Sequence, residues 1–582
     1  AEMEVKIAEL GYGAYYSDKI PFAYSYVAEN SVENNANTHG SHVTGIVAAN
    51  GDEENGGVKG VAPDAQIFAL KVFASDGLGS SVDNIIRAVE DAVKLGADII
   101  NLSLGSTPGF YDDVEYLQKA LATAEEHGLL ACVAAGNDGL ASSDKNANNT
   151  TNDWGVIDTG AVSSPSVYPG ALSVASVDNA FYSTTALDIF SGEEQIYSGA
   201  ATDFSVGNRT DWTSIGEVQL VDCGYGDLMT DIMPLFGNTP EGPFVALVQR
   251  GKDIAFGTKI MNASMLGAKA VIVYNNEATD EVVRNVLAEN AQFYAAVLVS
   301  GNTGAKLKEL AASGATVSFR GLYDAIVPNT TSGGDVSAFS SWGTTPTLDI
   351  KPEISAPGGS IRSLSKGTDY EVMSGTSMAT PYVAGSAALV LEALQDALAD
   401  GSLSLGGQSL NGFLKNTLMN TADPILDGSS IFSVRQQGSG MVDPMEAASN
   451  RVIATHDGIA SIALKEVGQT TSFTVTLTNY GTEAKTYTLP ASSQVYTDYT
   501  DPDSADYYVV PLNGASVSYG ASSVTVPAGG TASVTCTLNI PASAAQNHYV
   551  EAYVTFDGDI DLSLPLLGFY GDWYGCERII DL

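Results

Sequence analysis

The sequence predicts an α/β protein: a doubly wound, mostly parallel sheet with a small inserted α/β domain, followed by a C-terminal antiparallel β-sandwich. Short β-branched runs alternate with helical periods over about residues 61–180, and a smaller alternation fills about 185–325. Helical patterns disappear after about residue 450. Strands separated by whole helices favour right-handed crossovers and a parallel sheet covered on both faces. With 582 residues, the chain is also too long for one ordinary core.

The first alternation predicts three strands and two helices. Residues 81–96, SVDNIIRAVEDAVKLG, have the spacing of an amphipathic helix, with Ser81 placed to cap the N-terminus and Gly96 the C-terminus. A second helix is predicted over residues 114–128. Apolar and β-branched runs predict the strands, which are AQIFALKVF at 65–73, ADIINLSLG at 97–105 and LLACVAAGN at 129–137.

The composition changes near Phe181, where a second small pattern begins. It predicts two strands and two helices, with the strands over 242–251 and 269–276 and the helices over 254–268 and 304–314. The first pattern resumes at VSAFSSWG and ends in the helix-forming stretch SMATPYVAGSAALVLEALQDAL. We therefore predict a core domain made of residues 1–184 and 327–450, with a separate domain inserted at 185–326.

The C-terminal region, residues 451–582, alternates apolar and polar residues in segments such as TTSFTVTLTNYG and HYVEAYVTFDG, with turn residues between them. This pattern of period two predicts the antiparallel sandwich. Cys536 and Cys576 both fall in this region, and whether they pair is left open. Cys132 lies in the apolar run LLACVAAG and is predicted to be a buried thiol.

The charge of the chain limits its classes of partner. A formal net charge of −42 and a pI near 4.1 argue against nucleic acid, whose phosphates would be repelled. The acidic surface favours solubility in an exposed, extracellular setting, or attraction of basic polypeptides. No run of about 18 uninterrupted apolar residues is present, so no membrane-spanning segment is predicted.

Three short stretches contain the residue types that acyl transfer needs. His39 stands in NTHGSHVTGIVAAN, Asn137 leaves the strand of ACVAAGNDG, and Ser377 lies at the strand-to-helix turn of MSGTSMATPYVAG, where Gly375 is expected to allow a sharp turn. A serine hydroxyl can attack a carbonyl, an imidazole can take its proton, and an amide can hold the oxyanion. Each residue alone has an ordinary structural explanation as a cap or a turn. Their combination predicts a hydrolytic site.

These stretches resemble the His, oxyanion-Asn and Ser blocks of the subtilisin-like serine proteases, in the order of that family. VSAFSSWG and KPEISAPGG resemble the family's segment just before the serine, and the inserted region resembles a protease-associated domain. LTNYGTEAKTYTL and LPLLGFYGDW resemble the fibronectin type III-like domain of bacterial cell-envelope proteinases of the lactocepin and complement-cleaving peptidase type. The resemblance covers nearly the whole chain. It implies a subtilisin-like core and a secreted or cell-surface serine endopeptidase that acts on proteins or peptides.

The resemblance also implies roles for individual residues. Ser377 is expected to be the nucleophile, His39 the general base and then the acid, and the Asn137 side chain a donor to the oxyanion. The segment Ser103, Leu104 and Gly105 is expected to pair with an extended substrate. Ala135 and Gly136 are expected to form the opposite wall of the primary specificity pocket.

No cofactor is expected to be required. Calcium binding is common among subtilisin-like enzymes, and it is left open because no acidic cluster in this sequence has a convincing loop spacing. No metal ligand is therefore assigned.

The aspartate that orients the histidine in this family belongs on a strand before the histidine, and residues 1–38 contain no such strand. Asp18 is interpreted as a loop residue. Asp158, in WGVIDTGAV, has the local spelling of a catalytic aspartate, but it follows Asn137 and is interpreted as a turn residue.

We therefore expect the triad aspartate on an upstream segment that is absent from this chain and could remain bound as a cleaved N-terminal fragment. Two alternatives stay open. One is a catalytically inactive homologue that acts as a polypeptide-binding module. The other is permutation, or replacement of the aspartate by another acid.

Overall fold

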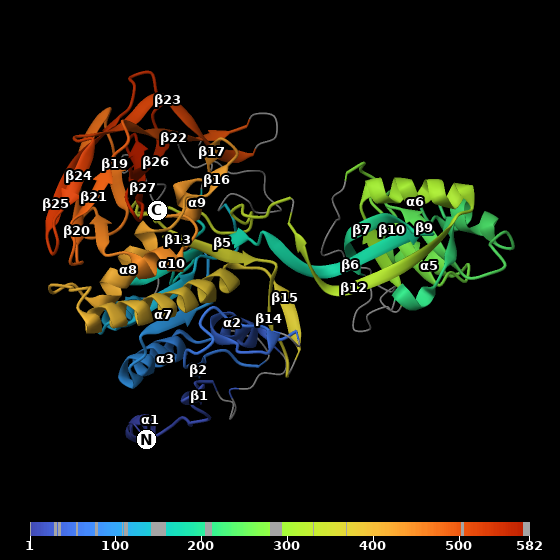
Figure 1. Ribbon diagram of the computed structural model, residues 1–582, viewed down its shortest axis with the longest axis horizontal. Coiled ribbons are helices and arrows are strands. Elements are labelled where there is room, and N and C mark those ends of the chain that lie inside the picture. Colours follow the sequence, from blue (N-terminus) through green and yellow to red (C-terminus); the bar gives the residue numbers. More distant parts are fainter. Residues whose placement is uncertain are drawn as a thin grey trace, which may run out of the picture. The chain divides into compact units, whose positions relative to one another are not determined.

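The computed structural model describes residues 2–27, 32, 37–53, 56–75, 80–107, 109, 115–140, 159–203, 212–279, 294–329, 331–367, 369–501 and 506–573. The chain forms two compact units, and Figure 1 labels many of their elements. The first unit consists of Ala1–Asn179 and Gly334–Leu582, and the second, inserted unit is Ala180–Gly333.

The centre of the first unit is a four-stranded parallel sheet. Its strands, in spatial order, are β13 (Ile354–Gly359), β5 (Ala171–Asp178), β4 (Leu130–Ala134) and β3 (Ile99–Leu102). Leu130 and Cys132 of β4 pack in one apolar cluster with helices α7 (Thr376–Asp400) and α8 (Leu410–Asn420). Ala131 and Val133 pack in another with α3 (Val82–Leu95) and α4 (Glu115–Glu126). Because helices cover both faces, the predicted doubly wound α/β fold is confirmed.

The first unit also contains a separate parallel sheet of two strands. It is formed by β1 (Phe22–Ser25) and β2 (Phe68–Lys71). The chain passes from β2 through α3 into β3, yet within the described part of the chain β2 pairs only with β1, and β3 only with β4. One edge of each of these two strands is therefore without a strand partner there. Helix α1 (Glu2–Leu10) contacts α3, where the Lys6 ammonium donates to the Leu95 carbonyl at 2.7 Å.

The capping residues predicted from the sequence delimit helix α3 as expected. The Ser81 hydroxyl accepts from the Asn84 backbone N–H and caps α3, and Gly96 ends the helix with φ of 81°. Helix α7 is long and apolar enough to cross a membrane by length and composition, but 67% of its apolar window is buried inside the protein. In Figure 1 it runs along the sheet beside α8, and its buried side chains include Ala379, Val383 and Val390.

The inserted unit is built around a closed barrel. Its strands are, in spatial order, β10 (Ala270–Tyr274), β11 (Ala296–Val299), β7 (Glu194–Asp203), β6 (Phe181–Ser191), β12 (Thr316–Pro328), β8 (Val218–Asp222) and β9 (Phe244–Gln249). Helices α5 (Phe256–Ser264) and α6 (Gly301–Ser313) accompany it. The strands and helices predicted at 242–276 and 304–314 are present as β9, α5, β10 and α6. Closure into a barrel was not predicted.

The C-terminal part of the first unit is β-rich and encloses its own apolar core. An eight-stranded sheet contains, in order, β18 (Val452–Thr455), β20 (Thr470–Asn479), β25 (Thr531–Asn539), β23 (Tyr507–Tyr519), β22 (Ser492–Thr500), β26 (His548–Phe556), β27 (Leu562–Tyr570) and β19 (Ile462–Glu466). A smaller sheet pairs β21 (Lys485–Thr488) with β24 (Ser523–Val526). The pairing is antiparallel as predicted, except that β19 runs parallel to β27.

The first unit contains several further helices and strands. They are α2 (His39–Ala48), the hairpin of β14 (Ile361–Leu364) and β15 (Tyr370–Met373), the short pair β16 (Leu426–Asp427) and β17 (Ser430–Ile431), α9 (Val434–Gln437) and α10 (Pro444–Ser449). Cys132 is a buried free thiol, as predicted, and Cys223 and Cys536 are also buried. Cys576 lies outside the described residues, so its pairing with Cys536 stays open.

Candidate active site

His39 is the first residue of helix α2, and its side chain is half-buried. The helix packs so closely on β14 that a Cβ added at Gly45 would come within 2.3 Å of the Ser363 hydroxyl oxygen. That hydroxyl donates to the His42 carbonyl at 2.8 Å. Gly45 thus permits this close packing, whereas a Cβ at Gly40 would meet nothing within 4 Å.

Ser377 is the second residue of helix α7 and is half-buried. The next residue, Met378, packs in an apolar cluster with Val43 and Ile46 of α2. This cluster holds the helix that starts at His39 against the first turn of the helix that carries Ser377. Gly375 does not have its expected role, because its backbone is extended and a Cβ there would make ordinary contacts with the Asn137 amide at 3.5 and 3.6 Å.

Asn137 is exposed and is hydrogen-bonded to the residue before Ser377. Its side-chain oxygen Oδ1 accepts from the Thr376 backbone N–H at 2.8 Å and from the Thr376 hydroxyl at 3.0 Å. The same hydroxyl accepts from the Gly136 backbone N–H at 3.2 Å. The Asn137 oxygen is therefore fully used, while its Nδ2 group donates to no acceptor among the described residues.

The predicted substrate-binding segments also contact this region. The Ser103 hydroxyl donates to the Ser377 carbonyl at 2.8 Å, which joins the end of β3 to the start of α7. A Cβ at Gly105 would lie 2.6 Å from the Ser163 hydroxyl oxygen, and the Ser163 backbone N–H donates to the Ala135 carbonyl at 2.8 Å. Leu104 packs, partly buried, on the cluster of β3 and β4. Ser163 therefore lies against Gly105 of one predicted segment and is hydrogen-bonded to Ala135 of the other.

Burial lowers the pKa of His39 below its ordinary value of 6.5, and the nearby His42 lowers it further. His42 is fully buried, and burial lowers its pKa as well. Its Nε2 lies 3.0 Å from the Ile361 carbonyl oxygen and 3.2 Å from that of Glu371, so Nε2 carries the proton. His42 therefore holds α2 against the β14–β15 hairpin.

No carboxylate forms an ion pair or a hydrogen bond with the His39 ring in the described part of the chain. Asp18 lies in an exposed loop and accepts a hydrogen bond from the Tyr15 hydroxyl. Asp158 falls outside the described residues, so its interpretation as a turn residue stays a prediction. The described residues contain no group of three His, Cys, Asp or Glu side chains that could hold a metal ion.

Comparison with known proteins identifies the family. A model described as the subtilase family matches residues 14–445. The chain belongs to the subtilase family. The predicted subtilisin-like fold and the resemblance are thereby confirmed. A model described as an Fn3-like domain matches residues 462–567, so the sandwich of this subtilase is of the fibronectin type III-like kind.

The relatives of this subtilase have proteinase names. The PII-type proteinase of Lacticaseibacillus paracasei is 34% identical over 591 residues, covering 97% of this chain and 31% of the relative. The PI-type proteinase of Lactococcus lactis subsp. cremoris is 34% identical over 590 residues, with the same coverage. The C5a peptidase of Streptococcus pyogenes is 28% identical over 593 residues, covering 97% of this chain and 46% of the relative. The subtilase chain thus spans about a third to a half of these relatives. The family and the names of these relatives support the prediction of a serine-type endopeptidase.

Sequence reasoning did not single out two residues of this region of the subtilase. Thr376 joins the Asn137 and Ser377 segments, and His42 fixes α2. Thr376 could have been singled out from the sequence, because it stands directly before the predicted nucleophile. The buried position of His42 has no comparable local signature, because its acceptors are carbonyls more than 300 residues away in sequence.

Proposed function

We propose that this chain is the catalytic part of a secreted or cell-surface serine endopeptidase that hydrolyses proteins or peptides through an acyl-enzyme. One observation supports this most directly. The Asn137 oxygen is bonded to Thr376, so the Asn137 amide donor, which has no acceptor among the described residues, stands beside the first turn of the helix that carries Ser377. The packing of Met378 against Val43 and Ile46 brings the helix that begins at His39 close to the same turn.

In the proposed reaction, the Ser377 hydroxyl oxygen attacks the scissile carbonyl carbon while the His39 imidazole takes the hydroxyl proton. The oxyanion of the tetrahedral intermediate accepts from the Asn137 Nδ2–H and from the Ser377 backbone N–H, which has no intrahelical acceptor in a first turn. His39 then protonates the leaving amine. Water attacks the acyl-enzyme by the same steps and releases the acid and Ser377.

The substrate is proposed to bind as an extended strand beside Ser103, Leu104 and Gly105, with Ala135 and Gly136 as the opposite wall of the primary pocket. The hydrogen bond from Ser103 to the Ser377 carbonyl would keep this strand in register with the nucleophile. The inserted unit is proposed to be a protease-associated domain that guides substrates. No cofactor is needed for these steps, and calcium binding stays a prediction.

The acid of the triad is proposed to lie on a segment outside this sequence. The low pKa of His39, set by burial and a second histidine rather than by a carboxylate, supports this. The second edge of β3 has no strand partner within the described residues. An extended polypeptide can add to such an edge. A segment parallel to β3 would end beside Ser103, and hence close to the Ser377 residue.

The alternative is a polypeptide-binding module without catalytic activity. One observation favours it, namely that no carboxylate contacts His39 among the described residues. Intact-mass analysis of material from the native source separates the two. A second fragment with an apolar strand ending in Asp supports the peptidase, and a single chain that does not react with an active-site probe supports the module.

The test of the proposal is labelling by a fluorophosphonate, which reacts with an activated serine. We expect wild-type protein to be labelled and Ser377→Ala to lose the label. Ser374→Ala is the matched control, because this neighbouring hydroxyl has a structural partner, the Ser360 N–H at 2.8 Å, and no role in the proposed reaction. Undiminished labelling of Ser377→Ala would refute the assignment of the nucleophile.

A further inference from the structure

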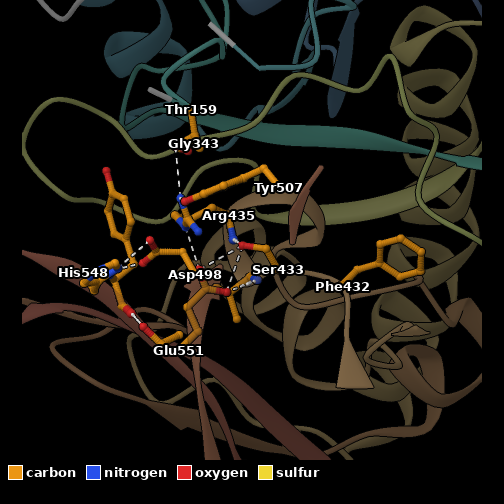
Figure 2. Close-up of polar contacts among 12 residues, drawn as sticks. Thr159, Gly343, Phe432, Ser433, Arg435, Asp498, Tyr507, His548 and Glu551 are labelled. Carbon is orange, nitrogen blue, oxygen red and sulfur yellow. Dashed lines mark hydrogen bonds and ion pairs between the residues drawn. The ribbon is translucent and has the colours of Figure 1, made fainter. Parts of the chain in front are cut away.

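A fully buried ion pair joins the core of the first unit to its sandwich (Figure 2). The Arg435 Nε of α9 donates to Glu551 Oε1 of β26 at 2.6 Å, and both side chains have 0% exposure. Glu551 is fully satisfied, since its other oxygen accepts from the Val434 backbone N–H at 2.7 Å and the Ser433 hydroxyl donates to both oxygens at 2.9 Å.

One terminal nitrogen of the guanidinium and its planar face contact both sides of the same junction. One terminal nitrogen donates to the Tyr507 hydroxyl at 2.9 Å and to the Thr159 hydroxyl oxygen at 3.2 Å. The group lies 3.9 Å from the ring centroid of Tyr549. The Thr159 hydroxyl in turn donates to the Gly343 carbonyl at 2.6 Å, and the Gly343 N–H donates to the Arg435 carbonyl at 2.7 Å. Arg435 therefore fixes two core segments, at residues 159 and 343, to the sandwich.

These two segments form the layer behind Gly136 and Asn137. The Ala161 N–H donates to the Trp342 carbonyl at 2.8 Å, and the Trp342 N–H donates to the Gly139 carbonyl at 2.9 Å. The Ser341 N–H donates to the Gly136 carbonyl at 3.0 Å. The Ser341 hydroxyl also accepts from the Asp138 N–H at 3.1 Å. Residues 135–139 thus have a continuous hydrogen-bonded backing that ends at Arg435.

We propose that Arg435 is a positioning residue for substrate binding, through which the fibronectin type III-like domain holds the wall formed by Ala135 and Gly136. The inference rests on the proposed function, because it assigns substrate binding to that wall. A buried arginine is suited to the task, since its planar fork reaches an acidic side chain and two hydroxyls in fixed directions. A buried ion pair is weak evidence for stability, because an apolar pair of similar volume often replaces it without loss.

That last property provides the test. The single variant Arg435→Met leaves Glu551 buried without its charge partner and is expected to lower the melting temperature. The double variant Arg435→Met with Glu551→Gln removes both charges but keeps a side-chain oxygen for the Ser433 and Val434 donors, so it is expected to recover most of that loss. If Arg435 only stabilises the fold, the double variant should bind substrate like the parent. If it positions the wall, binding stays impaired.

Binding is measured as the Kd of a fluorescent casein-derived peptide, by polarisation, in the Ser377→Ala background, so that no turnover is needed. We expect the double variant to raise Kd about tenfold, equivalent to the loss of one or two hydrogen-bonded supports. Leu477→Ala is the control for general destabilisation, because Leu477 is fully buried in a different apolar cluster from that of Val434 and Tyr549 beside Arg435. It should lower the melting temperature with Kd unchanged.

Two outcomes would overturn the inference. One is a double variant with recovered melting temperature and a parental Kd, and the other is a Leu477→Ala protein whose Kd rises as much as that of the double variant. Fluorophosphonate labelling of the wild type reports the proposed function separately. Wild-type protein that resists the probe but shows the expected Kd pattern would contradict catalysis and support the role of Arg435 in peptide binding.

Discussion

Asn137 and Thr376 are joined by two hydrogen bonds, both accepted by the Asn137 Oδ1, at 2.8 Å from the backbone N–H and 3.0 Å from the hydroxyl of Thr376. An amide has one oxygen and one nitrogen, so this pairing fixes which end faces Thr376. The Nδ2 group must then point away from Thr376. Ser377 follows Thr376 directly, and a donor beside its hydroxyl is what an oxyanion requires.

Asn137→Asp tests this arrangement with little change of shape. The carboxylate keeps an oxygen for Thr376 but loses the N–H₂ donor, so the fold should persist while turnover falls. We expect a loss of about 100- to 1,000-fold in kcat, which is the known effect of removing the oxyanion-hole asparagine of subtilisin, another subtilase. Peptide hydrolysis and thermal melts check it. Asn137→Ala, which also loses both bonds to Thr376, should lower the melting temperature more. Turnover kept within a few fold in Asn137→Asp would exclude Asn137 as the donor.

The pH profile reports the charge state of His39. The imidazole acts as a base only when neutral, and burial lowers its pKa below 6.5. In this chain alone, kcat/KM should therefore rise with pH through an apparent pKa below 6.5 and stay level above it. A carboxylate that contacts the ring favours the charged form and raises the pKa. Addition of the acid-carrying segment should move the rise to higher pH. A rise above 6.5 without any added segment would mean that a carboxylate already contacts His39.

Gly45→Ala should destabilise the protein, because the new Cβ would lie 2.3 Å from the Ser363 hydroxyl oxygen and 2.7 Å from Leu364 Cγ. The hydroxyl cannot turn away without losing its bond to the His42 carbonyl. We expect a loss of about 1–3 kcal/mol in the free energy of unfolding. Gly40→Ala is the matched control on the same helix, since its Cβ would meet nothing within 4 Å. Alanine is the better helix former, so this variant should be neutral or slightly stabilised. Equal losses in urea titrations of the two variants would contradict the packing argument.

The pair of His548 and Asp498 gives the sandwich a pH-dependent contribution to stability. The His548 Nδ1 lies 2.8 Å from Asp498 Oδ2, and this hydrogen bond raises the pKa of His548 above 6.5. A histidine with a raised pKa in the folded state stabilises the protein fully below the unfolded pKa of about 6.5. Its contribution is lost as pH rises through the folded pKa. The difference in melting temperature between wild type and His548→Asn should therefore shrink from pH 5.5 to pH 8.5. A difference that stays constant or grows over this range would show that protonation of His548 is not what stabilises the fold.

Several elements could be predicted because their signals are local. Ser81 and Gly96 bracket α3 with a hydroxyl that caps the first turn and a glycine that adopts a positive φ, and both act within a few residues. The alternation in TTSFTVTLTNYG predicts a strand in the same way, since period two is a property of the backbone itself. Closure of the inserted barrel and the parallel pairing of β19 with β27 could not be predicted, because no short stretch records which strands become neighbours.

For the site, the sequence determined which side chains are present and in which kind of local structure they stand. His39 begins a helix, Asn137 follows a strand, and Ser377 lies in a first helical turn, each dictated by the residues around it. Only the tertiary structure decided that Asn137 meets Thr376 across 239 residues and that Arg435 meets Glu551 across 116. Such contacts depend on how helices and strands pack into layers. That packing is a cooperative result of burying many apolar side chains at once, and no single motif encodes it.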